Sequence, residues 1–297
     1  MAKKSQKKKR NPPSQIKLVI GIVGAYGALV ILFIVLAIGL GIFVEYHSEE
    51  TWDEYGYVDE GDWSDDRDYR GCNVNGIEIH GEIVTYGGRS DDHIETSSDL
   101  ILSAIEYGEE EAGIKAHLIE VDSRGGYPVA GEEMMKFIAS AEKPTVILIR
   151  EAGLSAAYMA ALGGDVIFAS ANSDIGSIGV TMSYLDYSRQ NTFEGINFNQ
   201  LSSGPYKDAG HPEKTLTADE EEIFQRDIDQ LHQNFIDMVA TSRGLPREQV
   251  EAIADGSSML GSAALEKGLI DQIGSVLETE SYIKKQTGVE DISLCWY

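Results

Sequence analysis

The apolar and polar positions divide the chain into one long apolar run and a region of alternating strand and helix patterns. Residues 18–44 form a run of 27 residues without a single charge. A helix of this length crosses the hydrocarbon core of a bilayer with room for tilt. The run is longer than the apolar region of a secretory signal peptide, and no A-x-A-like cleavage site ends it. We therefore expect a transmembrane helix at 18–44.

The charges on the two sides of this run are unequal. Residues 1–17 carry seven basic residues and no acidic one, whereas residues 45–68 carry eleven acidic residues and one basic residue. Basic flanks stay in the cytoplasm, so a single-pass cell-membrane protein with an extracytoplasmic domain is expected. We predict a basic cytoplasmic segment at 1–17, an acidic stalk or linker at 45–75 and a folded domain at 76–297. A cation-binding arm is the alternative interpretation of the acidic segment.

From about Ile77, strand patterns alternate with helix patterns. Strands are expected at 77–84, 117–122, 145–150, 166–170 and 196–202, with SIGV at 177–180 after a glycine, and helices at about 92–111, 128–141, 155–162 and 217–243. Thr217 and Glu220 form a capping box at the start of the last helix. Its expected inner face consists of Ile223, Ile228, Leu231, Phe235, Ile236 and Val239. The alternation predicts βαβ units around a largely parallel sheet, and hence the α/β class.

Composition removes several classes of function. The chain has 24 basic and 49 acidic residues, a net charge of −25, which disfavours nucleic acid as a partner. No phosphate loop and no HExxH motif is present, two cysteines cannot build a zinc cluster, and the six histidines have no helical pair spacing. No cofactor and no metal are therefore expected. Cys72 and Cys295 are 223 positions apart and could form a disulfide or remain two buried thiols.

Three stretches that follow expected strands could carry chemistry. SRGG (123–126) could present backbone N–H groups to an oxyanion, or be an ordinary turn. Ser155 opens a helix rich in small residues and could be a nucleophile or a simple N-cap. The small residues around it suggest close approach to another element or to a bound chain. In the third stretch, SSGPYKDAGHP (202–212), a lysine that burial leaves neutral could deprotonate a serine. Lys207 and His211 are rival bases there, and a solvated surface charge is the alternative for Lys207.

The order of these stretches resembles the signal peptide peptidase SppA family of membrane-bound serine proteases, in its short, single-repeat form. The resemblance covers roughly residues 76–287. It is carried by SRGG (123–126), AGLSAAYM (152–159), GSIGV (176–180), SGPYKD (203–208), RGLPREQVEAIADG (243–256) and AALEKGLIDQIG (263–274).

This resemblance implies a ClpP/crotonase-like fold of stacked β-β-α units and peptide hydrolysis by a Ser–Lys dyad. Ser155 matches the nucleophile, Lys207 the general base, and Ser177 the serine that orients the lysine. The backbone N–H groups of Gly126 and Ala156 match the oxyanion hole. A substrate would lie as an added strand in a groove that includes Gly125, Tyr127 and Gly179.

The chain departs from the family pattern at three positions. Ala156 and Ala157 stand where two glycines are usual, and Arg124 stands where proline is usual. These changes narrow the approach to the serine and add a charge near the groove. The family's long members place the lysine and the serine in different repeats, so Lys207 of one protomer is expected to reach Ser155 of its neighbour. That arrangement implies a closed homo-oligomeric ring, an octamer in the family's short forms.

Three functions are consistent with this pattern. The first is a membrane-anchored serine endopeptidase that degrades hydrophobic peptides, such as cleaved signal peptides, at the outer membrane face. The second is an inactive relative that serves as a membrane scaffold or a peptide-binding module. The third, an acyl-CoA enzyme of the crotonase superfamily, leaves Ser155 and Lys207 unexplained. Retention of Ser155, Lys207 and Ser177 together favours the endopeptidase.

Overall fold

The structure is a computed structural model that describes residues 71–87 and 94–297. Tyr69–Tyr297 forms a compact unit. The predicted cytoplasmic segment 1–17, the predicted transmembrane helix 18–44 and all but the last residues of the stalk 45–75 lie outside the described residues. Within the described part of the chain, no helix combines the length and the hydrophobicity needed to cross a membrane.

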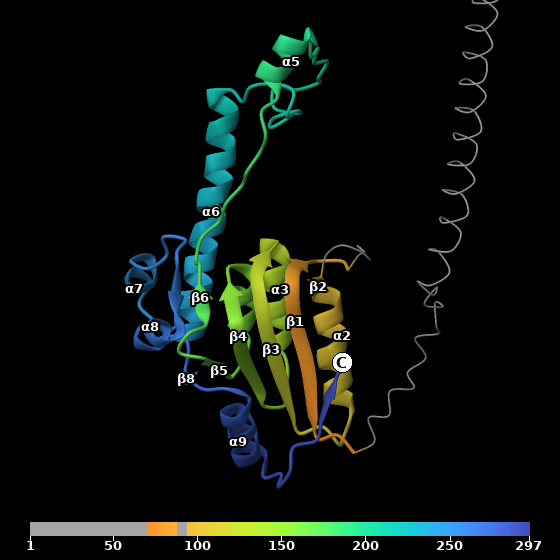
Figure 1. The fold of residues 1–297 in the computed structure, drawn as a ribbon, viewed down its shortest axis with the longest axis vertical. Helices are drawn as coiled ribbons and strands as arrows, with labels where there is room; N and C mark the ends of the chain where they lie inside the picture. Colours follow the sequence, from red (N-terminus) through yellow and green to blue (C-terminus); the bar gives the residue numbers. More distant parts are fainter. Residues whose placement is uncertain (1–70, 88–93) are drawn as a thin grey trace, which may run out of the picture. The chain divides into compact units, whose positions relative to one another are not determined.

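A twisted sheet forms the centre of this unit (Figure 1). Its strand order is β2-β1-β3-β4-β5-β8, and every neighbouring pair along this path is parallel. These strands are β1 (Val74–Val84), β2 (Glu95–Ser97), β3 (Ala116–Gly126), β4 (Thr145–Leu154), β5 (Val166–Ala169) and β8 (Gln272–Ile273). At the margins, β9 (Leu294–Trp296) pairs with β1, β6 (Asp174–Gly176) pairs with β4, and β7 (Ser258–Leu260) pairs antiparallel with β6. The predicted α/β class with a largely parallel sheet is confirmed.

Helices cover both faces of the sheet, but unequally (Figure 1). One face packs against α2 (Ser98–Glu110), α3 (Pro128–Ala139) and α4 (Ala156–Ala161), and the other packs against α9 (Val276–Thr287). Consecutive strand residues alternate between the two faces, as the pleat requires. In β4, Ile147 belongs to the larger core, whereas Val146 and Leu148 pack with Ile283 of α9.

The long helix α6 (Ala218–Arg243) is only half packed. Its predicted capping box is present, with Thr217 accepting from the Glu220 N–H. Of the predicted inner face, Phe235, Ile236 and Val239 are buried, whereas Leu231 is 38% exposed. The C-terminal half is further fixed by Arg243, which donates to both carboxylate oxygens of Asp271. The N-terminal half extends away from the sheet (Figure 1).

Three short elements complete the description. α5 (Ser188–Glu194) and the irregular segment after it lie at the far end of α6 (Figure 1). α7 (Arg247–Glu251) follows α6 and packs against it, whereas α8 (Gly261–Glu266) packs against β6, β7 and β8. We refer to residues 181–217 as the arm.

Four predictions about local structure are wrong. SIGV (177–180) forms no strand, because β6 ends at Gly176. Residues 196–202 form no strand, because within this protomer no neighbouring strand pairs with their backbone. SRGG (123–126) is not a turn but the end of β3, where Gly126 pairs with Ile83 of β1. The helix expected at 92–111 is divided into β2 and α2. It begins at Ser98 because the Ser97 side chain caps it by accepting from the Leu100 N–H.

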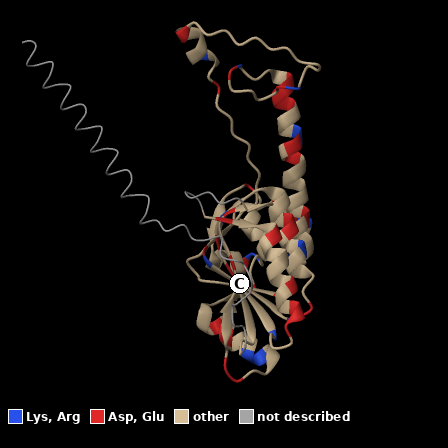
Figure 2. Ribbon diagram, turned by 90° about the vertical axis from the view of Figure 1, so that its right-hand side faces the viewer, with Lys and Arg blue, Asp and Glu red and all other residues tan. Residues whose placement is uncertain are grey.

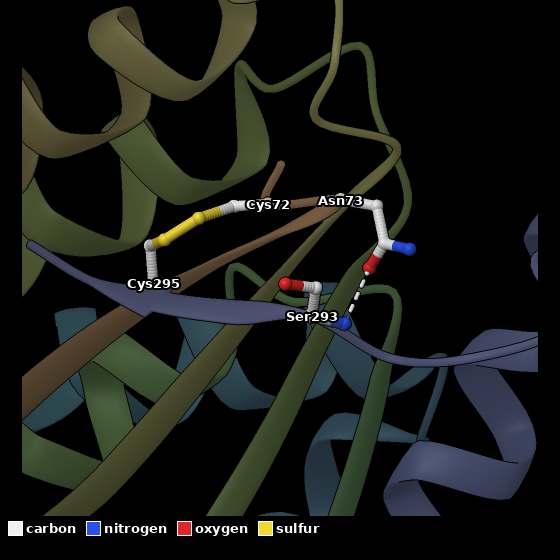
Figure 3. The surroundings of a disulfide bond; sticks show 4 residues. All are labelled: Cys72, Asn73, Ser293 and Cys295. Carbon is white, nitrogen blue, oxygen red and sulfur yellow. Dashed lines mark hydrogen bonds between the residues drawn. A yellow bond between two sulfur atoms is a disulfide. The ribbon is translucent and has the colours of Figure 1, made fainter. Parts of the chain in front are cut away.

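A disulfide between Cys72 and Cys295 joins the two ends of the unit (Figure 3). The Cα atoms are 5.9 Å apart, which suits a disulfide. Beside it, the Asn73 side chain accepts from the Ser293 N–H (2.9 Å) and donates to the Asp291 carbonyl (2.7 Å). Of the two alternatives that the sequence left open for Cys72 and Cys295, the structure has the disulfide and not two separate thiols. The bond holds β9 against β1.

Because this bond closes a loop of more than 200 residues, breaking it should destabilise the folded unit. A Cys72→Ser/Cys295→Ser variant should lose about 2–5 kcal/mol of unfolding free energy, measured by denaturant titration. Reductant should destabilise the wild type similarly and leave the variant unchanged. Identical wild-type unfolding curves with and without reductant would contradict the prediction.

Candidate active site

Ser155 lies between β4 and α4 in a backbone conformation that side-chain-bearing residues rarely adopt. Its φ is 52° and its ψ is −124°, and such strain persists only where the surroundings impose it. The Ser155 N–H donates to the Gly176 carbonyl (2.8 Å), and the Ser155 carbonyl accepts from the Met159 N–H (2.9 Å). The hydroxyl makes no capping hydrogen bond to α4. Capping, the alternative role of Ser155, is therefore not what this hydroxyl does.

The small residues after Ser155 allow α3 and α4 to pack closely. Ala156 and Ala157 are buried. A Cβ placed on Gly131 of α3 would lie 2.8 Å from the Ala156 carbonyl oxygen and 3.0 Å from its Cβ. The predicted close approach is thus made to another helix of the same chain. The two alanines, where the family pattern has glycine, are accommodated within the core.

Two glycines bring the end of β3 against Ser155. Gly125 has a φ of 109°, and a Cβ there would lie 2.8 Å from the Ser155 Cβ and 3.1 Å from the Ala156 nitrogen. A Cβ on Gly126 would lie 2.1 Å from the carbonyl oxygen of Ile83. Neither position has room for a side chain. The Ala156 N–H, in the first turn of α4, has no partner within the helix. Gly126 and Ala156 line the same cavity as Ser155.

A cavity of about 600 Å³ opens beside Ser155. It contains most of the predicted site residues, namely Ser155, Ser177, Gly126, Ala156 and Gly179. Gly125 lies directly against Ser155. Tyr127 is 60% exposed at the start of α3, next to Pro128 and Val129, which line the cavity. The structure thus brings together segments that are more than 50 residues apart in the sequence.

Ser177 is held in place by hydrogen bonds to the backbone of residues 256 and 257. Its φ is 50°, and its hydroxyl donates to the carbonyl oxygen of Gly256 (2.9 Å). Its N–H donates to the carbonyl of Ser257 (3.1 Å). Because the hydroxyl proton is used in this way, the lone pairs of the oxygen remain available to accept a hydrogen bond. The side chain can therefore receive an ammonium or hydroxyl donor that enters the cavity.

Lys207 and His211 do not line this cavity. Both belong to the arm, in the segment that leads into the N-terminal end of α6. Lys207 is exposed, whereas His211 stacks on Phe198 with ring centroids 4.6 Å apart. The cavity wall near Ser155 is formed instead by the buried Phe235 of α6.

The length of α6 keeps Lys207 away from Ser155 of the same chain. The neighbour of Lys207, Asp208, bonds to Lys214, which bonds to Glu220 in the first turn of α6. From Glu220 to Phe235 the helix rises about 22 Å. A lysine side chain cannot span such a distance. The structure therefore does not bring the two predicted dyad residues together within one protomer.

Several residues that line the cavity were not identified as site residues from the sequence. One wall is the apolar side of α6, with Ile228, Leu231, Phe235 and Met238. The charged and titratable side chains at the cavity are Arg124, Glu132, Asp229, His232 and Asp255. Hydrogen bonds from the Ser257 hydroxyl and N–H lower the pKa of Asp255. The residues of α6 are distant in sequence from Ser155, and the packing of α6 on the body places them at the cavity.

Within the described residues, no group of three or more His, Cys, Asp or Glu side chains could hold a metal ion. The cavity offers a serine hydroxyl, the five charged or titratable side chains and an apolar wall.

Similarity to known proteins agrees with this arrangement. A "Putative protease" of Methanocaldococcus jannaschii is 32% identical over 187 residues, covering 62% of this chain and 59% of that protein. A "Putative signal peptide peptidase SppA" of Enterococcus faecium is 30% identical over 192 residues, covering 64% of this chain and 56% of that protein. Protease 4 of Haemophilus influenzae is 25% identical over 230 residues, covering 74% of this chain and 37% of that protein. The chain thus matches little more than half the length of the first two relatives.

Among solved structures, a ClpP1 mutant from Listeria monocytogenes is similar with a TM-score of 0.45 and 14% identity, covering 68% of this chain and 92% of that chain. The model of peptidase family S49 matches residues 138–290, more than half of the chain. That stretch includes Ser155, Ser177 and Lys207, which were singled out from the sequence. The chain belongs to peptidase family S49.

Proposed function

We propose that the protein is a serine endopeptidase in which Ser155 is the nucleophile. The observation that carries this proposal is the strained Ser155, which lines a cavity, packs against Gly125 and does not use its hydroxyl to cap α4. The relatives named as proteases support the same activity. The sheet and its helices are also consistent with the ClpP/crotonase arrangement, which remains a prediction.

The proposed chemistry follows from these groups. The Ser155 hydroxyl attacks the peptide carbonyl and gives its proton to the neutral amine of Lys207. The N–H groups of Gly126 and Ala156 stabilise the oxyanion that develops. The amine then passes the proton to the leaving nitrogen, and water hydrolyses the acyl-enzyme. Ser177 would accept a hydrogen bond from the lysine and orient it.

We propose that Lys207 is supplied by a second copy of the chain. In one protomer Lys207 is distant from Ser155, so the dyad requires another chain. The arm exposes a series of apolar side chains, namely Met182, Tyr184, Leu185, Tyr187, Phe193, Ile196, Phe198, Leu201 and Tyr206. Exposed apolar groups gathered in this way are typical of an interface.

The charge of the arm also favours a second copy as its partner. It carries three basic and four acidic residues, so it is nearly neutral. By contrast, α6 carries seven acidic and two basic residues, and Figure 2 shows the acidic groups along it. A nearly neutral apolar surface lets copies of an acidic chain associate with little repulsion. A head-to-tail contact of this kind closes into a ring, for which an octamer is the proposed size.

The proposed substrates are hydrophobic peptides, such as cleaved signal peptides, held as an extra strand between 123–129 and 176–182. The apolar cavity wall of Val129, Met159 and Phe235 supports this choice.

We propose that a helix at 18–44 anchors the protein in the cell membrane, with the domain outside the cytoplasm. The disulfide fits such a compartment. A peptide-binding module without hydrolysis is the second candidate, favoured by the absence of Lys207 from the cavity of its own chain.

Replacing the nucleophile should stop hydrolysis without unfolding the protein. Ser155→Ala should lower kcat on a hydrophobic peptide by on the order of 10³-fold or more and abolish labelling by a fluorophosphonate probe. Ser183→Ala, which changes an exposed serine outside the cavity, is the matched control and should remain active. Full hydrolysis and labelling in Ser155→Ala would exclude Ser155 as the nucleophile.

Changing the proposed base should also abolish activity. Because the amine must be neutral to accept a proton, wild-type activity should rise with pH. Lys207→Arg should be inactive at every pH, since a guanidinium stays protonated. His211→Ala should retain activity. An active Lys207→Arg together with an inactive His211→Ala would transfer the role of base to His211.

Mixing two inactive variants tests whether the site is shared. In mixed oligomers of Ser155→Ala and Lys207→Ala chains, some junctions pair an intact serine with an intact lysine. Peptide hydrolysis should therefore recover in part after the two are unfolded and refolded together. Each variant refolded alone is the control. No recovery in oligomers that mass spectrometry confirms as mixed would contradict the shared site.

A further inference from the structure

The residue that follows Lys207 belongs to a cluster of three charged groups with little exposure. Lys214 Nζ donates to Asp208 Oδ1 (3.1 Å) and to Glu220 Oε1 (2.6 Å). The side chains of Lys214, Asp208 and Glu220 are only 18%, 19% and 2% exposed. Lys214 therefore joins two carboxylates that would otherwise repel each other. We refer to Asp208, Lys214 and Glu220 as the arm clamp.

The arm clamp connects the Lys207 loop to the start of α6. Glu220 Oε2 accepts from the Thr217 N–H (2.9 Å) and from the Thr217 hydroxyl (3.0 Å), so the same carboxylate is part of the helix cap. From the other side, the Gln200 side chain donates to Asp208 Oδ1 (2.5 Å). The position of Asp208 is thus fixed relative to the axis of α6, which the body holds at Phe235 and Val239.

Hydrogen bonds shift the pKa values of two clamp residues toward their charged forms. The hydrogen bond from Lys214, followed by that from the Thr217 N–H, lowers the pKa of Glu220 to about 2. Hydrogen bonds to Glu220 and to Asp208 raise the pKa of Lys214. Glu220 is therefore charged well below neutral pH, and Lys214 stays charged as the pH rises.

Two features suggest a role beyond local stability. Lys207 is exposed and has no side-chain hydrogen bond or ion pair to the described residues, although Asp208 beside it is held by two partners. The second oxygen of Asp208 is buried and lacks a hydrogen-bond partner among the described residues. Buried side-chain polar atoms normally have at least one hydrogen-bond partner. The clamp thus fixes the backbone next to Lys207 and leaves its side chain available.

We propose that Lys214, acting through Asp208 and Glu220, is a positioning residue that presents Lys207 to the Ser155 cavity of the neighbouring copy. This inference rests on the proposed function. A base that comes from another chain must be placed within a fraction of an ångström, because small misplacements cost much of the rate. Because the N-terminal half of α6 does not pack on the body, the arm is held away from the body. The clamp restricts the movement of the arm relative to α6.

The test compares Lys214→Met with the wild-type full-length chain on one hydrophobic peptide. kcat per labelled site should fall by roughly 10- to 100-fold, with KM changed by less than about twofold. The oligomer mass and the final fraction of chains labelled by a fluorophosphonate should be unchanged. Lys214→Arg should restore most of kcat, since a guanidinium can also bridge two carboxylates. Arg226→Gln, which removes an exposed cation on α6, is the matched control and should behave as the wild type.

Asp208→Asn provides a second variant of nearly unchanged shape, in case Lys214→Met does not assemble. It should also lower kcat at constant labelled fraction. Wild-type kcat in either assembled variant overturns the positioning role. So does a loss that matches a smaller labelled fraction, because that result indicates only structural damage.

Lys207→Ala, measured in parallel, separates the two proposals. If Lys207→Ala is inactive and Lys214→Met is fully active, only the positioning role fails. If Lys207→Ala is fully active, the dyad and the positioning role both fail.

Discussion

The close contact between the end of β3 and Ser155 is the constraint on which the rest of the site depends. A Cβ on Gly125 would lie 2.8 Å from the Ser155 Cβ, so only a glycine fits at position 125. The contact exists because β3 and β4 are parallel neighbours, paired at Ser123 and Gly153 near their carboxyl ends. It places backbone donors beside a hydroxyl without any side chain between them. Parallel pairing is thus what converts two short sequence motifs into one site.

The second constraint is the uneven packing of α6. Its C-terminal half is buried at Phe235, Ile236 and Val239 and forms a wall of the cavity. Its N-terminal half leaves the body and carries the arm, whose apolar side chains are exposed in one protomer. One helix therefore shapes the cavity and also carries Lys207 away from it. The proposed second copy of the chain accounts for both the exposed apolar surface and the separation of Lys207 from Ser155.

Several unrelated observations support the proposed peptidase activity. Family membership suggests a peptidase, whereas the strain at Ser155 and the room made by Gly125 are features of local geometry. The disulfide between Cys72 and Cys295 is of a kind that persists in oxidising compartments. It is therefore consistent with the extracytoplasmic position that we expect for the domain from the charges flanking residues 18–44. The departures from the family pattern also have a structural setting. Ala156 packs against α3, and Arg124 lines the cavity.

The sequence by itself determined the α/β class, the strand at 145–150 and the capping box of α6, and it singled out Ser155, Ser177 and Gly126 as candidate site residues. These depend on local periodicity, capping and motifs, which act over a few neighbouring residues. Only the tertiary structure decided that Cys72 and Cys295 are bonded, that residues 123–126 continue β3, and that 196–202 is not a strand. It alone separated Lys207 from the cavity and placed Phe235 in its wall. Pairing, burial and cavity walls depend on which distant segments meet, and local pattern does not specify that.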